Sequence, residues 1–98
     1  MSLPIDFEID AVDDVDGAFA WYENEQAGLG ERFLEAILDQ LDRIQENPEA
    51  HAILYRKTRA CPIRGFKYVI YFRLLDDRIN IVAVQHGHRN PRAWRRRV

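Results

Sequence analysis

The chain has 98 residues, of which 47% are hydrophobic and 31% charged, and its formal net charge is −2. This length and balance predict one soluble globular domain over residues 1–98 with a single core, and they exclude a disordered chain. No apolar run approaches the roughly 18 residues of a membrane span and the acidic N-terminus does not resemble a signal peptide, so we expect a cytoplasmic protein.

The two halves of the chain carry opposite charge. Residues 1–50 hold 14 acidic and 2 basic side chains, a net charge of −12, whereas residues 51–98 hold 2 acidic and 12 basic side chains, a net charge of +10. Because the basic residues lie on predicted strands and beyond the last of them, we expect a shared anion-binding surface. The alternative is that the two halves neutralise each other across the fold or are simply solvated.

The N-terminal half predicts one strand and two helices. Alternating apolar and acidic residues over 5–9 favour a half-buried strand, after which Asp10 suits the N-cap of an amphipathic helix over 11–25. A tight connection at Gly28 and Gly30 precedes a strong three-and-four apolar repeat, which predicts a second helix over 31–46. Helices joined so closely form an αα-hairpin, and we expect its acidic residues to face solvent.

The C-terminal half predicts strands and a short final helix. Residues 55–63 favour one strand, and the runs 66–75 and 78–85 favour a β-hairpin, with a second strand that is apolar on both faces and therefore central. Asn90 and Pro91 suit the start of a short helix over 91–97. We therefore expect an α+β fold, in which an N-terminal strand and an αα-hairpin pack on a mainly antiparallel sheet that a short helix follows.

Most candidates for function follow the last predicted strand. His86 and His88 lack a third ligand, so we expect no metal. The sequence has no phosphate-binding glycine loop, so we expect no cofactor, and no nucleophile motif of a conventional hydrolase is present. His88 beside Arg89 could exchange a proton, although packing or hydrogen bonding is the alternative. Six residues are candidates for binding the target: Arg64, Lys67, Arg89, Arg92, Trp94 and Arg95. Alternatively, Trp94 closes the end of the sheet and the terminal arginines only aid solubility.

Several stretches resemble the RelE/ParE superfamily of toxins from bacterial type II toxin–antitoxin modules. In chain order they are AVDDVDGAFAWYENEQAGLGERFLEAI, the helix ending in ENP, GFKYVIYF, DDRINIVAVQHGHR and RNPRAW. The resemblance spans nearly the whole chain and implies a βααβββ toxin of the plasmid-stabilisation kind. It also implies a cognate antitoxin that wraps the toxin with an extended or helical segment, in a hetero-oligomer, with a homodimer as a further possibility.

The superfamily includes two activities, which imply different site residues. RelE-like members cut messenger RNA on the ribosome with an arginine in the strand that matches residues 66–72, an arginine just after the last strand, and a tyrosine near the C-terminus. Arg89 matches the second of these, but Lys67 and Tyr68 stand at the first and Trp94 and Arg95 near the third. These departures favour the ParE-like branch, whose members inhibit DNA gyrase by binding it and are not enzymes.

Two alternatives follow from the same resemblance. One is a ribosome-dependent endoribonuclease of messenger RNA, for which Arg89, His88 and Lys67 are the candidate catalytic residues. The other is a degenerate, non-toxic member of the superfamily that only binds its antitoxin.

Overall fold

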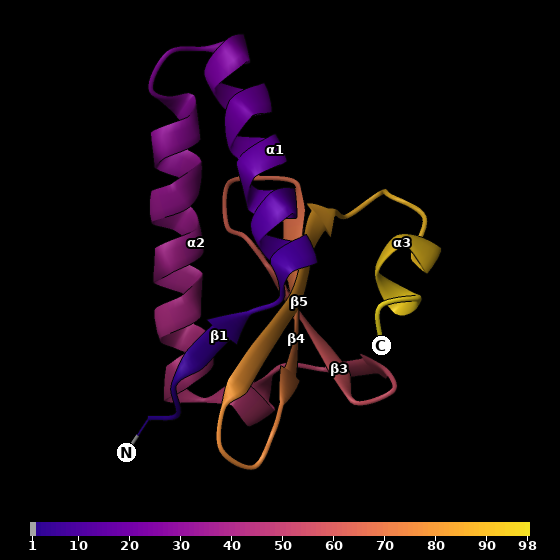
Figure 1. Cartoon of the computed structure of the whole chain (residues 1–98). Helices are drawn as coiled ribbons and strands as arrows, with labels where there is room; N and C mark the ends of the chain where they lie inside the picture. Colours follow the sequence, from indigo (N-terminus) through magenta and orange to yellow (C-terminus); the bar gives the residue numbers. More distant parts are fainter. Residues whose placement is uncertain (1) are drawn as a thin grey trace.

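The computed structural model describes residues 2–98 and consists of an αα-hairpin on one face of a five-stranded sheet (Figure 1). Its elements are β1 (Ile5–Phe7), α1 (Ile9–Glu25), α2 (Leu29–Glu46), the 3₁₀ turn η1 (Pro48–Ala50), β2 (Ile53–Tyr55), β3 (Thr58–Pro62), β4 (Tyr68–Leu74), β5 (Ile79–His86) and α3 (Arg92–Arg95). The strand order is β1-β5-β4-β3-β2, and only the β1–β5 pair is parallel. The α+β fold predicted from the sequence is confirmed.

The main core lies between the hairpin and the sheet. Phe33, Ile37 and Ile44 of α2 are buried because their three-and-four spacing places them on one side of the helix. They belong to one apolar cluster with side chains of α1 and of the central strands, namely Ala11, Ala18, Ile70, Phe72, Ile79, Ile81 and Val84. Among the described residues, no helix is long and apolar enough to cross a membrane.

A β-bulge at Val82 explains why β5 is apolar on both faces. In the register with β4, Phe72 pairs with Ile81 and Tyr71 pairs with Ala83, so Val82 is left over. A bulge of this kind shifts the two-residue alternation of the strand by one position. The side chains of β5 that join the helix-side core are therefore Ile79, Ile81 and Val84, whereas Ala83 packs on the opposite face.

Asp14 and Arg97 close the open edge of β5. The short β1 ends at Phe7, so Val82 and Val84 extend past its last pairing with β5. The Val84 N–H donates to Asp14 Oδ2 at 2.9 Å, and Arg97 Nη1 donates to the Val82 carbonyl at 3.1 Å. Backbone groups that would otherwise lack partners are thereby satisfied by two side chains.

The same two side chains form a charged pair with two hydrogen bonds. Arg97 Nη1 and Nη2 lie 2.7 and 3.0 Å from the two Asp14 carboxylate oxygens, and the side chains are 17% and 11% exposed, respectively. The hydrogen bond to Asp14 raises the pKa of Arg97 above its usual value, so the guanidinium stays charged. Our expectation that the acidic residues of the hairpin face solvent is thus wrong for Asp14.

The single strand predicted over residues 55–63 is instead two short strands, β2 and β3. They fold back at Arg56 and Lys57, whose φ angles are 44° and 62°. Residues other than glycine rarely adopt this left-handed conformation, and the sequence has no Gly, Asn or Asp there to indicate a turn.

The first helix begins earlier than predicted, and Asp10 is not its cap. The Glu8 N–H donates to the Ile81 carbonyl at 2.9 Å, which holds Glu8 at the end of the parallel ladder. Helix α1 therefore begins at Ile9, and the Glu8 side chain, which makes no cap bond, accepts instead from Asn80 Nδ2 at 3.2 Å. The final helix is also shorter than predicted, at Arg92–Arg95.

Replacement of Asp14 by alanine tests the edge closure. We expect Asp14→Ala to lower the free energy of unfolding by about 3 kcal/mol, because it removes the closest carboxylate of Arg97, whose contact with Asp10 is 3.9 Å long, and leaves the Val84 N–H without its acceptor. Chemical denaturation measures the effect, and Asp13→Ala, which removes an adjacent exposed carboxylate, is the matched control. Equal losses in the two variants would contradict the assignment.

Candidate functional site

The strand-end cluster consists of Lys67, Tyr68, His86, His88 and Arg89. Pairing of Tyr68 with His86 brings the start of β4 beside the end of β5. The Gly87 N–H then donates to the Lys67 carbonyl at 2.8 Å, which fixes the loop after β5 next to the turn before β4. Residues about 20 positions apart in sequence therefore share one end of the sheet.

The two histidines of the cluster contact each other through a local hydrogen bond. The His88 backbone N–H donates to His86 Nδ1 at 3.1 Å, which makes that nitrogen an acceptor and leaves Nε2 to carry the proton of the neutral ring. The centres of the His86 and His88 rings lie 5.5 Å apart. Among the described residues, no group of three or more potential metal ligands surrounds them.

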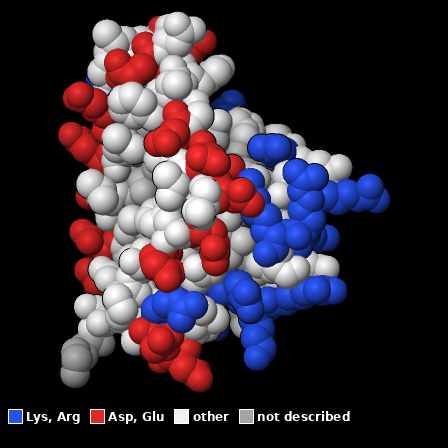
Figure 2. Space-filling model, viewed as in Figure 1, with Lys and Arg blue, Asp and Glu red and all other residues white. Residues whose placement is uncertain are grey.

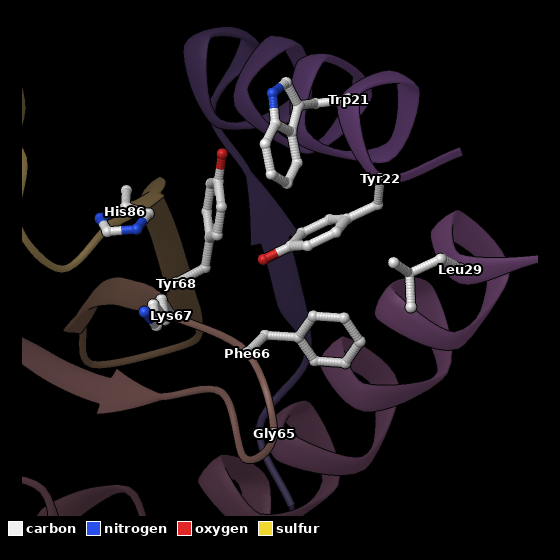
Figure 3. Close-up of a pocket in the computed structure, with 8 residues that line it drawn as sticks. All are labelled: Trp21, Tyr22, Leu29, Gly65, Phe66, Lys67, Tyr68 and His86. Atoms are coloured by element: carbon white, nitrogen blue, oxygen red, sulfur yellow. The ribbon is translucent and has the colours of Figure 1, made fainter. Parts of the chain in front are cut away.

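A pocket of about 610 Å³ opens beside the cluster (Figure 3). Trp21 and Tyr22 of α1 form one wall, Leu29 of α2 contributes from the hairpin tip, and the turn before β4 closes the other side. The remaining lining residues are Gly65, Phe66, Lys67, Tyr68 and His86. A largely aromatic wall with a cation and an imidazole at the edge suits an apolar group that carries a nearby negative charge.

The aromatic wall is held by ring contacts, edge-on between Tyr22 and Phe66 and tilted between Tyr22 and Tyr68. Tyr22 lies 5.0 Å from Phe66 and 5.8 Å from Tyr68 between ring centres. Burial raises the pKa of Tyr22, the neighbouring Tyr68 raises it further, and a hydrogen bond with the Lys67 backbone offsets part of this. Tyr22 therefore stays protonated at neutral pH. Trp21, by contrast, is 56% exposed at the mouth.

The hairpin tip positions Trp21, Tyr22 and Leu29 by a close approach of the two helices. Glu23 Oε1 accepts the Gly30 N–H at 2.9 Å, so a residue of α1 caps the first turn of α2. This bond explains why α2 begins at Leu29 and not at the predicted residue 31. A Cβ atom at Gly30 would lie 2.7 Å from the Glu23 side chain and 2.9 Å from the Phe19 ring.

The six residues predicted to grip a partner do not form one surface. Lys67 and Arg89 belong to the strand-end cluster, but Arg64 lines a separate small cavity with Arg43 of α2. Arg92 is exposed on α3, and the guanidinium carbon of Arg95 lies 5.0 Å from the centre of the Tyr55 ring. Figure 2 nevertheless shows most basic side chains away from the helices, whose surface is largely acidic.

The structure corrects the prediction that the Trp94 side chain binds a partner. This side chain is only 3% exposed and stacks on Tyr71 with 4.5 Å between ring centres. Together with Ala83 they form a second small core on the sheet face opposite the hairpin. The alternative role, in which Trp94 covers the sheet, is the one that the structure supports.

Sequence reasoning missed the helix residues of the pocket. The sequence predicts only that Trp21 and Tyr22 lie on an amphipathic helix, because the helical periodicity does not indicate which end of the sheet packs against that part of the helix. The available signal was Trp21 itself, a large aromatic residue at a position that the helical pattern places off the buried side. Cys61 is buried, and burial raises the pKa of its thiol, with the charge of Arg43 as a partial offset.

An αα-hairpin on a mainly antiparallel sheet with a basic strand end is the arrangement expected of the RelE/ParE superfamily. The chain belongs to the family of ParE toxins of type II toxin–antitoxin systems, parDE, whose family model matches residues 5–91. It is 34% identical over 82 residues to Toxin ParE2 from two strains of Mycobacterium tuberculosis, and the match covers 83% of this chain and 78% of that relative.

Solved structures share the fold at low sequence identity. The chromosomal ParDE system of P. aeruginosa matches with a TM-score of 0.76 and 15% identity, over 87% of this chain and 96% of that one. The RelBE2 complex of Mycobacterium tuberculosis gives 0.64 and 19%, over 88% and 99%. A double mutant of the E. coli toxin RelE in the free state gives 0.60 and 15%, over 90% and 86%.

Two glycines of the hairpin provide a matched test of the helix contact beside the pocket. We expect Gly30→Ala to lower the free energy of unfolding by about 1–3 kcal/mol, since its Cβ would overlap Glu23 and Phe19. A Cβ at Gly17 meets nothing within 4 Å, so Gly17→Ala should instead stabilise α1 by up to about 1 kcal/mol. Thermal unfolding of both variants decides, and a shift of the same sign in both would refute the close approach.

Proposed function

We propose that the protein is a toxin that inhibits DNA gyrase by binding it through the strand-end cluster and the adjacent pocket. The observation that supports this proposal is that exposed Lys67 lines an open aromatic pocket, while exposed His88 and Arg89 directly follow His86, which lines the same pocket. Tryptophan and arginine dominate the binding energy of protein interfaces, and Trp21 and Arg89 are an exposed pair of these types. Trp21 thus replaces Trp94 as the aromatic anchor that we expected.

Binding is favoured over RNA cleavage because the groups for cleavage are incomplete. Cutting RNA requires a base for the 2′-hydroxyl, stabilisation of the added phosphate charge, and an acid for the leaving oxygen. Arg89 and Lys67 supply charge, but the C-terminal aromatic residue is a buried tryptophan, whose indole N–H is not acidic enough to protonate the leaving oxygen. The strand arginine of the RelE-like pattern is absent as well.

One observation favours the alternative, a RelE-like endoribonuclease acting on ribosome-bound messenger RNA. His86, His88 and Tyr68 lie near Arg89, and the centres of the Tyr68 and His86 rings are 5.6 Å apart. An imidazole titrates near neutral pH and can transfer a proton. A non-toxic member that only binds its antitoxin would show neither activity.

We also propose that the protein acts in the cytoplasm and is neutralised there by a cognate antitoxin. The supporting observation is the charge of residues 51–98, which attracts an acidic or amphipathic segment along the strand side of the molecule. Such a complex would be a toxin–antitoxin hetero-oligomer.

The target is tested with two assays on the same purified protein. We expect inhibition of plasmid supercoiling by gyrase and intact messenger RNA on translating ribosomes. Arg89→Ala and Trp21→Ala should each raise the half-inhibitory concentration about tenfold or more. Arg56→Ala, an exposed arginine on the turn between β2 and β3, should change it little.

The opposite pair of results would support the endoribonuclease. Cleaved message with unaffected gyrase would reject gyrase inhibition, and Arg89→Ala should then abolish the cleavage. Inactivity in both assays, with antitoxin binding retained, would indicate the degenerate member.

Association with the antitoxin should depend on salt. We expect the association rate to fall as ionic strength rises from about 0.05 to 0.3 M, because screening shortens the reach of the basic surface. Stopped-flow fluorescence measures the rate. A rate that does not change with salt would contradict an electrostatic role for residues 51–98.

A further inference from the structure

The aromatic pocket is lined without any acidic side chain, although the chain carries 16 Asp and Glu residues. Four other hollows on the molecule each include at least one carboxylate, among them those of Asp16, Asp10, Asp13 and Asp39. The formal charge at the aromatic pocket is instead the ammonium group of Lys67. Its electrostatics therefore favour an anionic ligand.

The Lys67 ammonium group is available to a ligand. Its side chain is exposed, and the ion pairs found within residues 2–98 involve Arg78 and Arg97 and not Lys67. A hydrogen bond between an ammonium group and a carboxylate is stronger than one between neutral groups, because both partners are charged. Lys67 is thus a suitable anchor for a carboxylate.

Two neutral donors accompany this cation. His86 Nδ1 accepts the His88 N–H, so the neutral imidazole has its Nε2 proton to donate. The Tyr22 hydroxyl accepts a hydrogen bond from the Lys67 backbone, the contact that partly offsets the effect of burial on its pKa, and its own proton remains to be donated. A carboxylate only accepts hydrogen bonds, so it matches this set of one cation and two donors.

The apolar walls of the pocket are held in place before any ligand binds. The Tyr22 ring lies 5.1 Å from the fully buried Phe33 ring and 5.0 Å from the Phe66 ring, between centres. Trp21 packs edge-on against Tyr22 at 5.1 Å, and its exposed ring stands at the opening (Figure 3). A planar apolar group in the pocket would cover aromatic surface that now faces water.

The size of the pocket and its lining together define a class of ligand. Its volume of about 610 Å³ lies in the range of small-molecule sites. A small inorganic anion would leave the aromatic walls in water, and a neutral hydrocarbon would leave the Lys67 charge unused. A ring that carries a carboxylate uses both features.

A free small molecule fits the pocket better than a segment of a protein. In an extended segment, neighbouring side chains point to opposite sides, so an aromatic residue and an adjacent Asp or Glu do not enter one pocket together. A free aromatic acid carries its ring and its carboxylate within a few bonds. We propose that the aromatic pocket binds a small aromatic carboxylate as a free ligand. Competition of this ligand with gyrase is a further consequence, which rests on the proposed function.

The full-length ¹⁵N-labelled chain and 2-naphthylacetate test the proposal by NMR. We expect saturable shifts of the Trp21 indole signal and of the Gly65 and Lys67 backbone amide signals, with a Kd of about 1 mM or tighter. The compound 2-naphthylacetamide has the same ring without the charge and should bind about fivefold more weakly. Acetate, which has no ring, should leave these signals unshifted at the same concentration.

Lys57 provides a matched control for Lys67. We expect Lys67→Gln to weaken binding of 2-naphthylacetate about fivefold and to leave binding of the amide unchanged. Lys57→Gln removes the same charge from an exposed position on the turn between β2 and β3, and it should change neither affinity. Trp21→Ala should weaken binding of both compounds, because it removes apolar contact area. Thermal unfolding checks that each variant is folded.

Several outcomes would overturn the proposal. These are equal affinities for the acid and the amide, equal effects of Lys57→Gln and Lys67→Gln, and no saturable shift up to about 10 mM, ten times the expected Kd. Tighter binding of the peptide acetyl-Trp-Asp-amide than of 2-naphthylacetate would assign the pocket to a protein segment.

A supercoiling assay separates this proposal from the proposed function. Relief of gyrase inhibition by 2-naphthylacetate would support both the ligand site and the contact of gyrase with the pocket. Saturable binding without relief would support the ligand site and reject only the gyrase contact at the pocket. Inhibition of gyrase by a chain that does not bind 2-naphthylacetate would reject the ligand site alone.

Discussion

The ion pair between Asp14 and Arg97 is the interaction that connects the separate parts of this small fold. The bulge at Val82 and the early end of β1 leave two backbone groups of β5 without strand partners, and the pair satisfies both of them. The same contact joins the first turns of α1 to the C-terminal residues. A domain of this size buries a limited fraction of its surface, so one partly buried pair with four hydrogen bonds has a large structural effect.

The separation of charge follows from the order of the elements along the chain. The hairpin is formed by the acidic half and the antiparallel strands mostly by the basic half, so the two charges lie on different sides of the molecule (Figure 2). Asp14 with Arg97 and Asp6 with Arg78 are places where the halves meet as ion pairs. Neutralisation between the halves is therefore local, and most of the charge remains available to steer partners of opposite sign.

Helix α1 contributes to three surfaces because its side chains point in different directions along its length. Asp14 reaches β5, Val12 lines a shallow apolar groove between α1 and α2, and Trp21 and Tyr22 form the wall of the aromatic pocket. This distribution explains why the apolar and polar side chains are less clearly separated on α1 than on α2. Most apolar side chains of α2 pack in the core. Helix α1 thus supplies exposed apolar side chains to two separate surfaces.

The sequence alone determined the two helices, the interior place of β5 and the order of the elements apart from the division between β2 and β3, because these follow from local periodicity and from apolar runs. It also placed Arg89 just beyond the end of the last strand. It did not reveal the turn at Arg56 and Lys57, since their left-handed backbone is imposed by the pairing of β2 with β3. The burial of Trp94, the pairing of Asp14 with Arg97 and the pocket of Trp21 with Tyr68 were likewise decided by the tertiary structure. Each depends on residues distant in sequence that only the packed sheet and hairpin bring together.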